Sequence, residues 1–314
     1  MTEKKQGVGE AAGKIILMGE HSVVYGEPAI AFPFQGTAVT ATVTPSAAMT
    51  IDCSYYSGPL AQSPRQLENI KELVQQIFSF LKKAPTAFAI TISSTIPSER
   101  GMGSSAATAV AVVRSFFDYY EYTYTQKELL SLVSFSEKIA HGNPSGIDAA
   151  ATSGFNPVLF IKGEPLHHFP MNLSHTYLVV ADTGIKGQTR TVVKDVAQLF
   201  QQDQQTILAK MTALGTLTKQ AKAAIMADDN QMLGRLMTAA QNYLQTLSIS
   251  NPILDQLVAT ALANNALGAK LTGGGRGGCM IALADSLSTA ETIAQALEKQ
   301  GAVTTWIQSL EVKK

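Results

Sequence analysis

The sequence predicts a globular protein that mixes β-strands with α-helices, and three observations lead to this class. Hydrophobic residues make up 46% of the 314 residues and charged residues 15%, which is typical of a compact protein with a core. Several short segments alternate apolar and polar residues with the period of a strand. Longer segments repeat apolar residues with the period of a helix. A chain of this length forms one large domain or two medium domains.

The first half of the chain alternates predicted strands with predicted helices. Residues 14–19 (KIILMG) predict the first strand, and residues 37–43 (TAVTATV) alternate Val or Ala with Thr. Residues 67–83 repeat Leu, Ile and Val at helical spacing. Further strands are predicted at 49–55, 87–93, 158–162 and 177–182, and further helices at 104–120 and 126–141.

The second half is predicted to be mostly helical from residue 189 to residue 266. A strand (GAKLT), a glycine-rich loop, a strand at 279–284, a helix at 286–300 and a strand at 303–310 follow. Turn-forming residues are concentrated at 160–175, so we expect a domain boundary there. We place one domain at residues 1–165 and the other at residues 166–314.

The charge balance excludes some classes of partner. Lys+Arg and Asp+Glu number 24 each, whereas nucleic-acid-binding proteins usually carry a basic excess, so we expect no nucleic acid. No apolar run reaches the roughly 18 residues that span a membrane, and the first residues lack the apolar stretch of a secretion signal. Cys53 and Cys279 are far apart in the sequence, so we expect no disulfide framework and a cytoplasmic protein.

Residues 7–14 (GVGEAAGK) are similar to two nucleotide-binding motifs and match neither. A Walker A loop needs glycine where Val8 stands and Ser or Thr where Ile15 stands. A dinucleotide fingerprint needs a third glycine where Ala12 stands. We expect residues 7–11 to form a flexible tail that leads into the first strand, which leaves Lys14 unexplained.

The segment IPSERGMGSSAATAV (96–110) joins a glycine-rich loop to the start of a helix. Gly101 and Gly103 allow a sharp turn and a close approach of the backbone to a ligand. The free N–H groups and the positive dipole end of the helix favour a phosphate there. Ser104 and Ser105 add two hydroxyls, one for phosphate and one for a magnesium ion. Taken alone, the segment is explained at least as well by a serine N-cap on a core helix.

Two carboxylates are candidates for chemistry. Glu137 lies late in a predicted helix among apolar neighbours, and a buried carboxylate needs a partner or a metal. His141, one helical turn further on, is a neighbour of Glu137 rather than half of a zinc site. Asp148 lies among small residues that leave room for a substrate, whose hydroxyl it could orient and deprotonate. Alternatively, Asp148 caps a helix that begins at Ala149.

The segment LTGGGRGGC (271–279) holds five glycines between two predicted strands. Two interpretations are open. The run is either a flexible hairpin or a loop whose backbone amides close over a phosphate chain.

Four segments in order resemble the GHMP small-molecule kinases, the family of galactokinase, homoserine kinase, mevalonate kinase and phosphomevalonate kinase. These segments are AAGKIILMGEHSVVYGEPAIA (11–31), GMGSSAA, HGNPSGIDAAA and LTGGGRGGC, and together they span roughly residues 11 to 284. Four ordered motifs are far more specific than any one. Within the family, GEHSVVYGEPAI and GNPSGIDAAA are most similar to the branch that phosphorylates mevalonate.

The resemblance implies a role for each candidate residue. Asp148 would be the catalytic base or would orient the acceptor hydroxyl of mevalonate, and Lys14 would stabilise charge on the transferring phosphoryl group. Glu137 and Ser105 would hold Mg²⁺. The other implied contacts are those of the ATP phosphates with Gly101, Gly103, Ser104 and Ser105, and those of mevalonate with Glu20, His21 and Thr189.

The resemblance also implies an α+β fold of two domains. The N-terminal α/β domain would bind ATP and contain a left-handed βαβ unit, which is an exception to the usual handedness, and the C-terminal domain would be ferredoxin-like. ATP, Mg²⁺ and mevalonate are the implied ligands. The retention of Lys14, Ser105, Glu137 and Asp148 favours an enzyme over a non-catalytic binding protein on the same fold. A sister kinase that acts on another small alcohol or on phosphomevalonate is the nearest alternative.

Three features of the sequence are left without an assigned role. Ser98, Glu99 and Arg100 make the entrance of the second motif more polar than is usual in the family, and Arg276 replaces a glycine or apolar residue in the last motif. Arg276 either contacts phosphate or is solvated. The run rich in Ala, Leu and Met at 205–247 is either the surface of a homodimer or part of the core.

Overall fold

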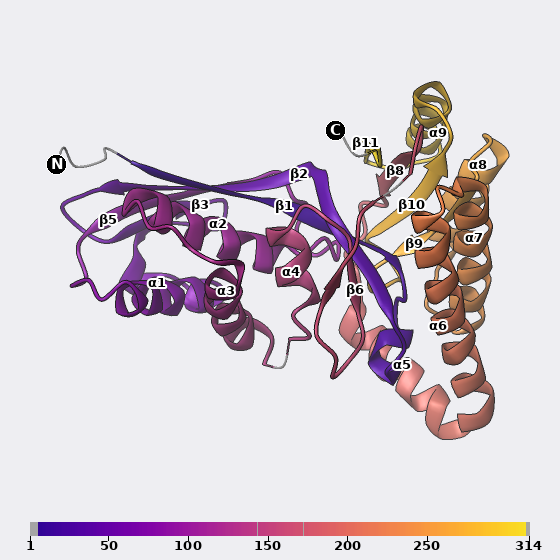
Figure 1. Cartoon of the computed structure of the whole chain (residues 1–314), viewed down its shortest axis with the longest axis horizontal. Coiled ribbons are helices and arrows are strands. Elements are labelled where there is room, and N and C mark those ends of the chain that lie inside the picture. Colours follow the sequence, from indigo (N-terminus) through magenta and orange to yellow (C-terminus); the bar gives the residue numbers. More distant parts are fainter. Residues whose placement is uncertain (1–5, 143, 172, 312–314) are drawn as a thin grey trace. The chain divides into compact units, whose positions relative to one another are not determined.

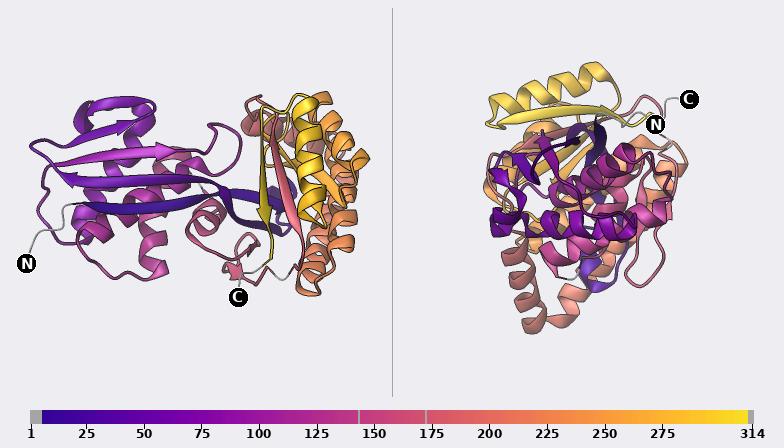
Figure 2. Two further views of the ribbon diagram at one scale, coloured as in Figure 1. Left: turned by 90° about the horizontal axis from the view of Figure 1, so that it is seen from above. Right: turned by 90° about the vertical axis from the view of Figure 1, so that its left-hand side faces the viewer.

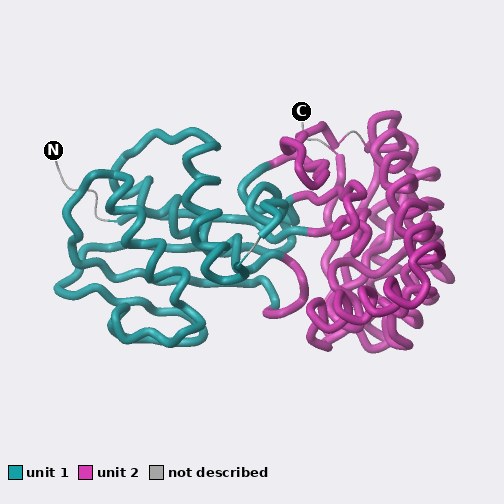
Figure 3. The backbone as a smooth tube through the Cα atoms, turned by 90° about the horizontal axis from the view of Figure 1, so that it is seen from below, with its two compact units in different colours: residues 1–14, 33–97, 103–154 teal, residues 15–32, 98–102, 155–314 magenta. Residues whose placement is uncertain are grey.

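The computed structural model describes residues 6–142, 144–171 and 173–311, so Asn143 of the HGNPSGIDAAA motif lies outside the described residues. The chain forms two compact units, which Figure 3 distinguishes by colour. Neither unit is one continuous stretch. Unit 1 comprises residues 1–14, 33–97 and 103–154, and unit 2 comprises residues 15–32, 98–102 and 155–314. Within the part of the chain that is described, none of the helices is both long enough and apolar enough to cross a membrane.

The larger sheet has seven strands in the order β4-β3-β5-β2-β6-β7, with β1 paired to β2. Its strands are β1 (Gly7–Met18), β2 (Ala29–Pro45), β3 (Thr50–Cys53), β4 (Tyr56–Pro59), β5 (Phe88–Ser94), β6 (Val158–Phe160) and β7 (His167–His168). The strands predicted for this region are confirmed, although β1 and β2 are longer than expected. β3 and β5 pair in parallel with a helix between them in the chain, and the handedness of this unit stays a prediction.

Among its described residues, unit 1 contains the helices α1 (Glu68–Phe80), α2 (Ser104–Tyr119), α3 (Gln126–His141) and α4 (Ile147–Ser153). Helices α1, α2 and α3 lie on one face of the sheet (Figure 1). The ring of Phe78 lies edge-on to that of Phe116, with centroids 5.6 Å apart, and Phe88 of β5 packs on both rings. Helix α3 begins at a capping box between Thr125 and Glu128, which satisfies two backbone N–H groups at its start.

The expectation of a flexible tail at residues 7–11 is wrong, because β1 already begins at Gly7. The two glycines of this segment lie directly on the backbone of α2. A Cβ at Gly7 would lie 2.2 Å from the carbonyl oxygen of Ser115, and a Cβ at Gly9 would lie 2.1 Å from that of Ala111. The glycines of GVG therefore serve close strand–helix packing, which is one of the few uses of glycine inside a strand.

The smaller sheet belongs to unit 2 and has four antiparallel strands in the order β11-β8-β10-β9. Its strands are β8 (Tyr177–Asp182), β9 (Gly268–Thr272), β10 (Cys279–Ala284) and β11 (Thr304–Ser309). The helices of unit 2 are α5 (Thr189–Gln202), α6 (Gln204–Met226), α7 (Asn230–Thr246), α8 (Pro252–Ala263) and α9 (Leu287–Lys299). With α5 to α8 as the first helical connection, the chain runs β-α-β-β-α-β, so the expected ferredoxin-like domain is confirmed.

Helices α7, α8 and α9 pack against the four-stranded sheet, on one of its faces in the left view of Figure 2. Every residue of β9 and β10 is buried, which fits the continuously apolar sequence of β10. Much of the run at 205–247 is core, because α6 and α7 bury residues such as Met211, Leu214, Leu233 and Met237.

Candidate active site

Unit 1 brings four of the predicted residues together. Lys14 lies on β1, Ser105 at the start of α2, Glu137 on α3 and Asp148 in the first turn of α4. The Nζ atom of Lys14 is 2.9 Å from Oδ1 of Asp148. The hydroxyl of Ser105 donates a hydrogen bond to Oε1 of Glu137 at 2.6 Å. The charges of Asp148 and Lys14 both act on Glu137, so the two pairs form one cluster.

Glu137 has the environment of a metal ligand. Burial raises the pKa of its carboxyl, while the hydrogen bond from Ser105 and the charge of His141 act in the opposite direction. A divalent cation would offset the cost of burying this carboxylate. Across the described ranges, His, Cys, Asp and Glu form no group of three or more that could hold a metal.

The start of α2 is not a serine N-cap. Gly103 occupies the N-cap position in the left-handed conformation, with φ of 73°, and Ser104 is the first residue of the helix. A Cβ at Gly103 would lie 3.2 Å from Cβ of Lys14 and 3.2 Å from Cγ2 of Thr152. Glycine is therefore required both by the backbone angle and by the closeness of Lys14.

Asp148 is not a helix cap either. Helix α4 begins at Ile147, its N-cap is Gly146, and no side chain bonds to the cap. The carboxylate of Asp148 instead pairs with Lys14. The Asp148 side chain is 38% exposed and that of Lys14 is 5% exposed, so a substrate hydroxyl can reach the carboxylate while the ammonium group stays shielded.

In unit 2, His21 lies just after β1 and has a positive φ of 59°. Its Nε2 atom donates a hydrogen bond to the carbonyl oxygen of Gly274 at 2.9 Å. Burial lowers the pKa of His21 to about 4, with a smaller effect in the same direction from the charge of Arg276. The ring is therefore neutral at pH 7. Because Nε2 carries the proton, Nδ1 is a hydrogen-bond acceptor.

Glu20, the residue before His21, forms a buried ion pair with Lys270 of β9. Lys270 also donates to the carbonyl oxygen of Leu271 at 2.7 Å. Burial lowers the pKa of Lys270, and the charge of Glu20 opposes this effect. The sequence analysis did not single out Lys270. The available signal was one lysine inside an apolar strand that leads directly into a glycine run.

The glycine-rich loop at 273–278 is fixed by contacts with α5. A Cβ at Gly274 would lie 1.9 Å from the hydroxyl oxygen of Thr189, the first residue of α5. The backbone N–H of Gln188 donates to the carbonyl oxygen of Gly275 at 3.3 Å. These contacts favour a fixed loop over a flexible hairpin, and they place Thr189 beside the residue that holds His21.

Arg276 holds this loop to neighbouring elements. Its Nη1 atom forms an ion pair with Asp195 of α5, and its Nε atom donates to the carbonyl oxygen of Ser248 at 2.9 Å. The Nε and Nη1 atoms of the guanidinium are thus engaged by protein oxygens, so Arg276 is not simply solvated.

Gly101 is the remaining predicted residue, and it lies in the glycine-rich loop that precedes α2. Gly101 belongs to unit 2, and a Cβ there would lie 3.7 Å from Cα of Gly273. Arg100 and Asp182, which the sequence analysis did not propose as site residues, form an ion pair with 2.7 Å between Nε and Oδ1.

Family models match both parts of the chain. The model described as "GHMP kinases N terminal domain" matches residues 70–155, and "GHMP kinases C terminal" matches residues 221–303. A relative named mevalonate kinase from Thermococcus onnurineus is 32% identical over 313 residues, covering 90% of this chain and 92% of the relative.

Two solved structures are similar over nearly the whole chain. The crystal structure of L. major mevalonate kinase in complex with R-mevalonate gives a TM-score of 0.82 at 29% identity, covering 97% of this chain and 96% of the other. The mevalonate kinase from methicillin-resistant Staphylococcus aureus gives a TM-score of 0.76 at 33% identity, covering 98% of this chain and 100% of the other.

Proposed function

Because the chain belongs to the GHMP kinase family, we propose that this ATP-dependent small-molecule kinase is a mevalonate kinase. It transfers the γ-phosphoryl group of ATP to the 5-hydroxyl of (R)-mevalonate and produces 5-phosphomevalonate for isoprenoid biosynthesis. The observation that carries this proposal is the similarity over 90% or more of the chain to enzymes named mevalonate kinase, one of them in complex with R-mevalonate.

Asp148 and Lys14 carry the transfer step in this proposal. The exposed carboxylate of Asp148 orients the 5-hydroxyl of mevalonate and accepts its proton as the oxygen attacks the γ-phosphorus. Lys14, 2.9 Å away and shielded from solvent, fixes the carboxylate and stabilises negative charge on the transferring phosphoryl group. Positioning and charge stabilisation supply most of the barrier reduction in such a transfer.

The phosphates of ATP bind to main-chain and hydroxyl groups in this proposal. Gly101 and Gly103 allow the backbone to approach the phosphates closely, and Ser104 begins α2, whose N-terminus favours an anion. Ser105 and Glu137 provide two oxygens for Mg²⁺. When bound, Mg²⁺ neutralises charge on the phosphates.

Glu20, His21 and Thr189 bind mevalonate in this proposal. His21 is neutral, and its Nε2–H is engaged by Gly274, so Nδ1 faces the substrate as an acceptor for a hydroxyl. Glu20 is held in place by its ion pair with Lys270, and it contributes to mevalonate binding beside His21, the next residue in the chain.

Three further assignments accompany the proposal. The boundary between the two family domains lies at residues 165/166, and the matched ranges on either side support it. A cytoplasmic location is supported by Cys53 and Cys279, which are both free thiols. Assembly into a homodimer stays a prediction.

The test is ADP release with Mg-ATP against a panel of four acceptors: mevalonate, phosphomevalonate, galactose and homoserine. We expect turnover with mevalonate and none above background with the other three. Turnover with phosphomevalonate or a sugar instead would keep the kinase and overturn the mevalonate assignment.

A further inference from the structure

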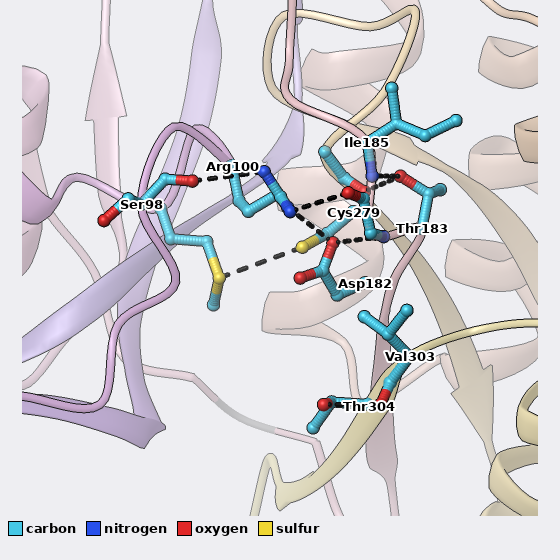
Figure 4. Close-up of polar contacts among 11 residues, drawn as sticks. Ser98, Arg100, Asp182, Thr183, Ile185, Cys279, Val303 and Thr304 are labelled. Atoms are coloured by element: carbon cyan, nitrogen blue, oxygen red, sulfur yellow. Dashed lines mark hydrogen bonds and ion pairs between the residues drawn. The ribbon is translucent and has the colours of Figure 1, made fainter.

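Arg100 makes three polar contacts within unit 2, and all three guanidinium nitrogens are used (Figure 4). Nε donates to Oδ1 of Asp182 at 2.7 Å, Nη2 to the carbonyl oxygen of Gly184 at 2.9 Å and Nη1 to that of Ser98 at 3.2 Å. The side chains of Arg100 and Asp182 are 14% and 5% exposed. The ion pair is thus largely removed from water. Removing one partner of such a pair leaves the other charge buried and uncompensated.

The turn after β8 connects this ion pair to the glycine-rich loop at 273–278. Oδ1 of Asp182 also accepts from the N–H of Gly184 at 2.9 Å, which fixes the turn. The hydroxyl of Thr183 donates to the carbonyl oxygen of Gly278 at 2.7 Å, and the N–H of Gly278 donates to Ile185 at 2.7 Å. The same four-residue turn therefore binds Arg100 through Asp182 and Gly184, and it binds the end of the loop through Thr183 and Ile185.

The two glycine-rich segments also touch each other. A Cβ at Gly278 would lie 3.0 Å from the carbonyl oxygen of Arg100. The sulfur atoms of Met102 and Cys279 are 3.8 Å apart. Gly101, between Arg100 and Met102, has a positive φ of 77° and lies against Gly273. A change in the position of Arg100 would therefore move main-chain groups in both segments.

We propose that Arg100 is a positioning residue for ATP. Its ion pair with Asp182 holds residues 98–102 against residues 273–278, so that the glycine-rich backbone of both segments is in place for the phosphate chain. This inference rests on the proposed function for the identity of the nucleotide. Three of the five N–H donors of Arg100 already bond to protein oxygens and the side chain is 14% exposed, so we assign the residue a role through the loop and not as a phosphate ligand.

The test measures the Kd of a fluorescent ATP analogue with Mg²⁺, together with KM for ATP and KM for mevalonate. In Arg100→Ala, we expect Kd and KM for ATP to rise about tenfold to a hundredfold. KM for mevalonate should rise much less, because Gly274, which holds His21, is also seated on Thr189 of α5. Asp182→Asn keeps the shape of the side chain and removes its charge, so it should raise Kd in the same direction. The double variant should bind no more weakly than Arg100→Ala, because the two residues act as one unit.

A second ion pair offers a matched control. Lys186 forms an ion pair with Glu99, so this pair also joins residues 98–102 to the stretch that follows β8. The side chains of Lys186 and Glu99, however, are 74% and 59% exposed. Exposed pairs contribute little, so Lys186→Met should leave Kd within about twofold of the wild-type value.

Arg100→Lys keeps the test informative if Arg100→Ala fails to fold. Lysine retains the cation without the planar fork, so its Kd should fall between those of the wild type and the alanine variant. The proposal is overturned by an unchanged Kd in both variants, or by equal rises in the two KM values. It is also overturned if Asp182→Asn leaves Kd unchanged, since Arg100 would then contact phosphate itself.

Binding of the analogue is measured without any acceptor. A wild-type protein that binds the nucleotide and phosphorylates nothing in the panel would therefore overturn the proposed function and leave the test of Arg100 valid.

Discussion

In the proposed mechanism, the transfer step depends most on Asp148. Asp148→Asn keeps the size of the side chain and removes the proton acceptor beside Lys14. We expect turnover to fall about 10²- to 10⁴-fold, the usual contribution of a general base. ADP release measures the effect, and far-ultraviolet circular dichroism checks the fold. Asp52→Asn, at an exposed position on β3 of the same unit, is the control and should be fully active. Near-normal turnover in Asp148→Asn would refute its role as base.

His21 should make stability depend on pH. Its pKa is about 4 in the folded protein against an ordinary 6.5, so the unfolded chain binds the proton more readily. This group contributes nothing to the pH dependence above pH 6.5, and it destabilises the fold progressively as pH falls from about 6.5 to about 4. At pH 5 the loss is about 2 kcal/mol.

The measurement is urea unfolding at pH 7 and pH 5 for the wild type and for His21→Gln. Glutamine can still donate to Gly274 but does not titrate, so the variant should lose less stability on acidification by about 2 kcal/mol. Equal losses in the two proteins would show that His21 is not buried as a neutral ring.

Packing between elements is tested where β1 lies on α2. Gly9→Ala places a methyl group against the carbonyl oxygen of Ala111, a backbone atom that moves only if the strand or the helix moves. We expect a loss of about 1–3 kcal/mol in the free energy of unfolding, the usual cost of overpacking. Val8→Ala, at an exposed position on the same strand, should change it by at most about 0.5 kcal/mol. A neutral Gly9→Ala would mean that β1 is not seated on α2.

The elements could be predicted from the sequence where periodicity was strong. Helices such as α3, with its capping box, and alternating strands such as β5 were found within a few residues of their ends. The start of β1 was missed because two of the three residues of GVG are glycines, which are depleted in strands, and these glycines are explained only by the distant backbone of α2. The serine cap on α2 and the aspartate cap on α4 were local interpretations, and contacts with β1 and α3 determine the actual partners.

The candidate site was predictable to the extent that its residues lie in motifs. The Lys14–Asp148 and Ser105–Glu137 pairs join residues that the motifs had singled out. Lys270, Arg100 and Asp182 were not predicted, because each is defined by a partner far away in the sequence. The role of Arg276 could not be decided from the sequence for the same reason, since Asp195 carries no motif of its own.

For the whole molecule, the central claim is that this kinase phosphorylates the primary hydroxyl of mevalonate. The most direct measurement is the proton-coupled ³¹P NMR spectrum of the product formed from (R)-mevalonate and Mg-ATP. We predict a new phosphate monoester resonance that is split into a triplet by the two protons of the adjacent methylene group. A spectrum without a new monoester signal, or a signal without methylene coupling, would contradict transfer to the 5-hydroxyl.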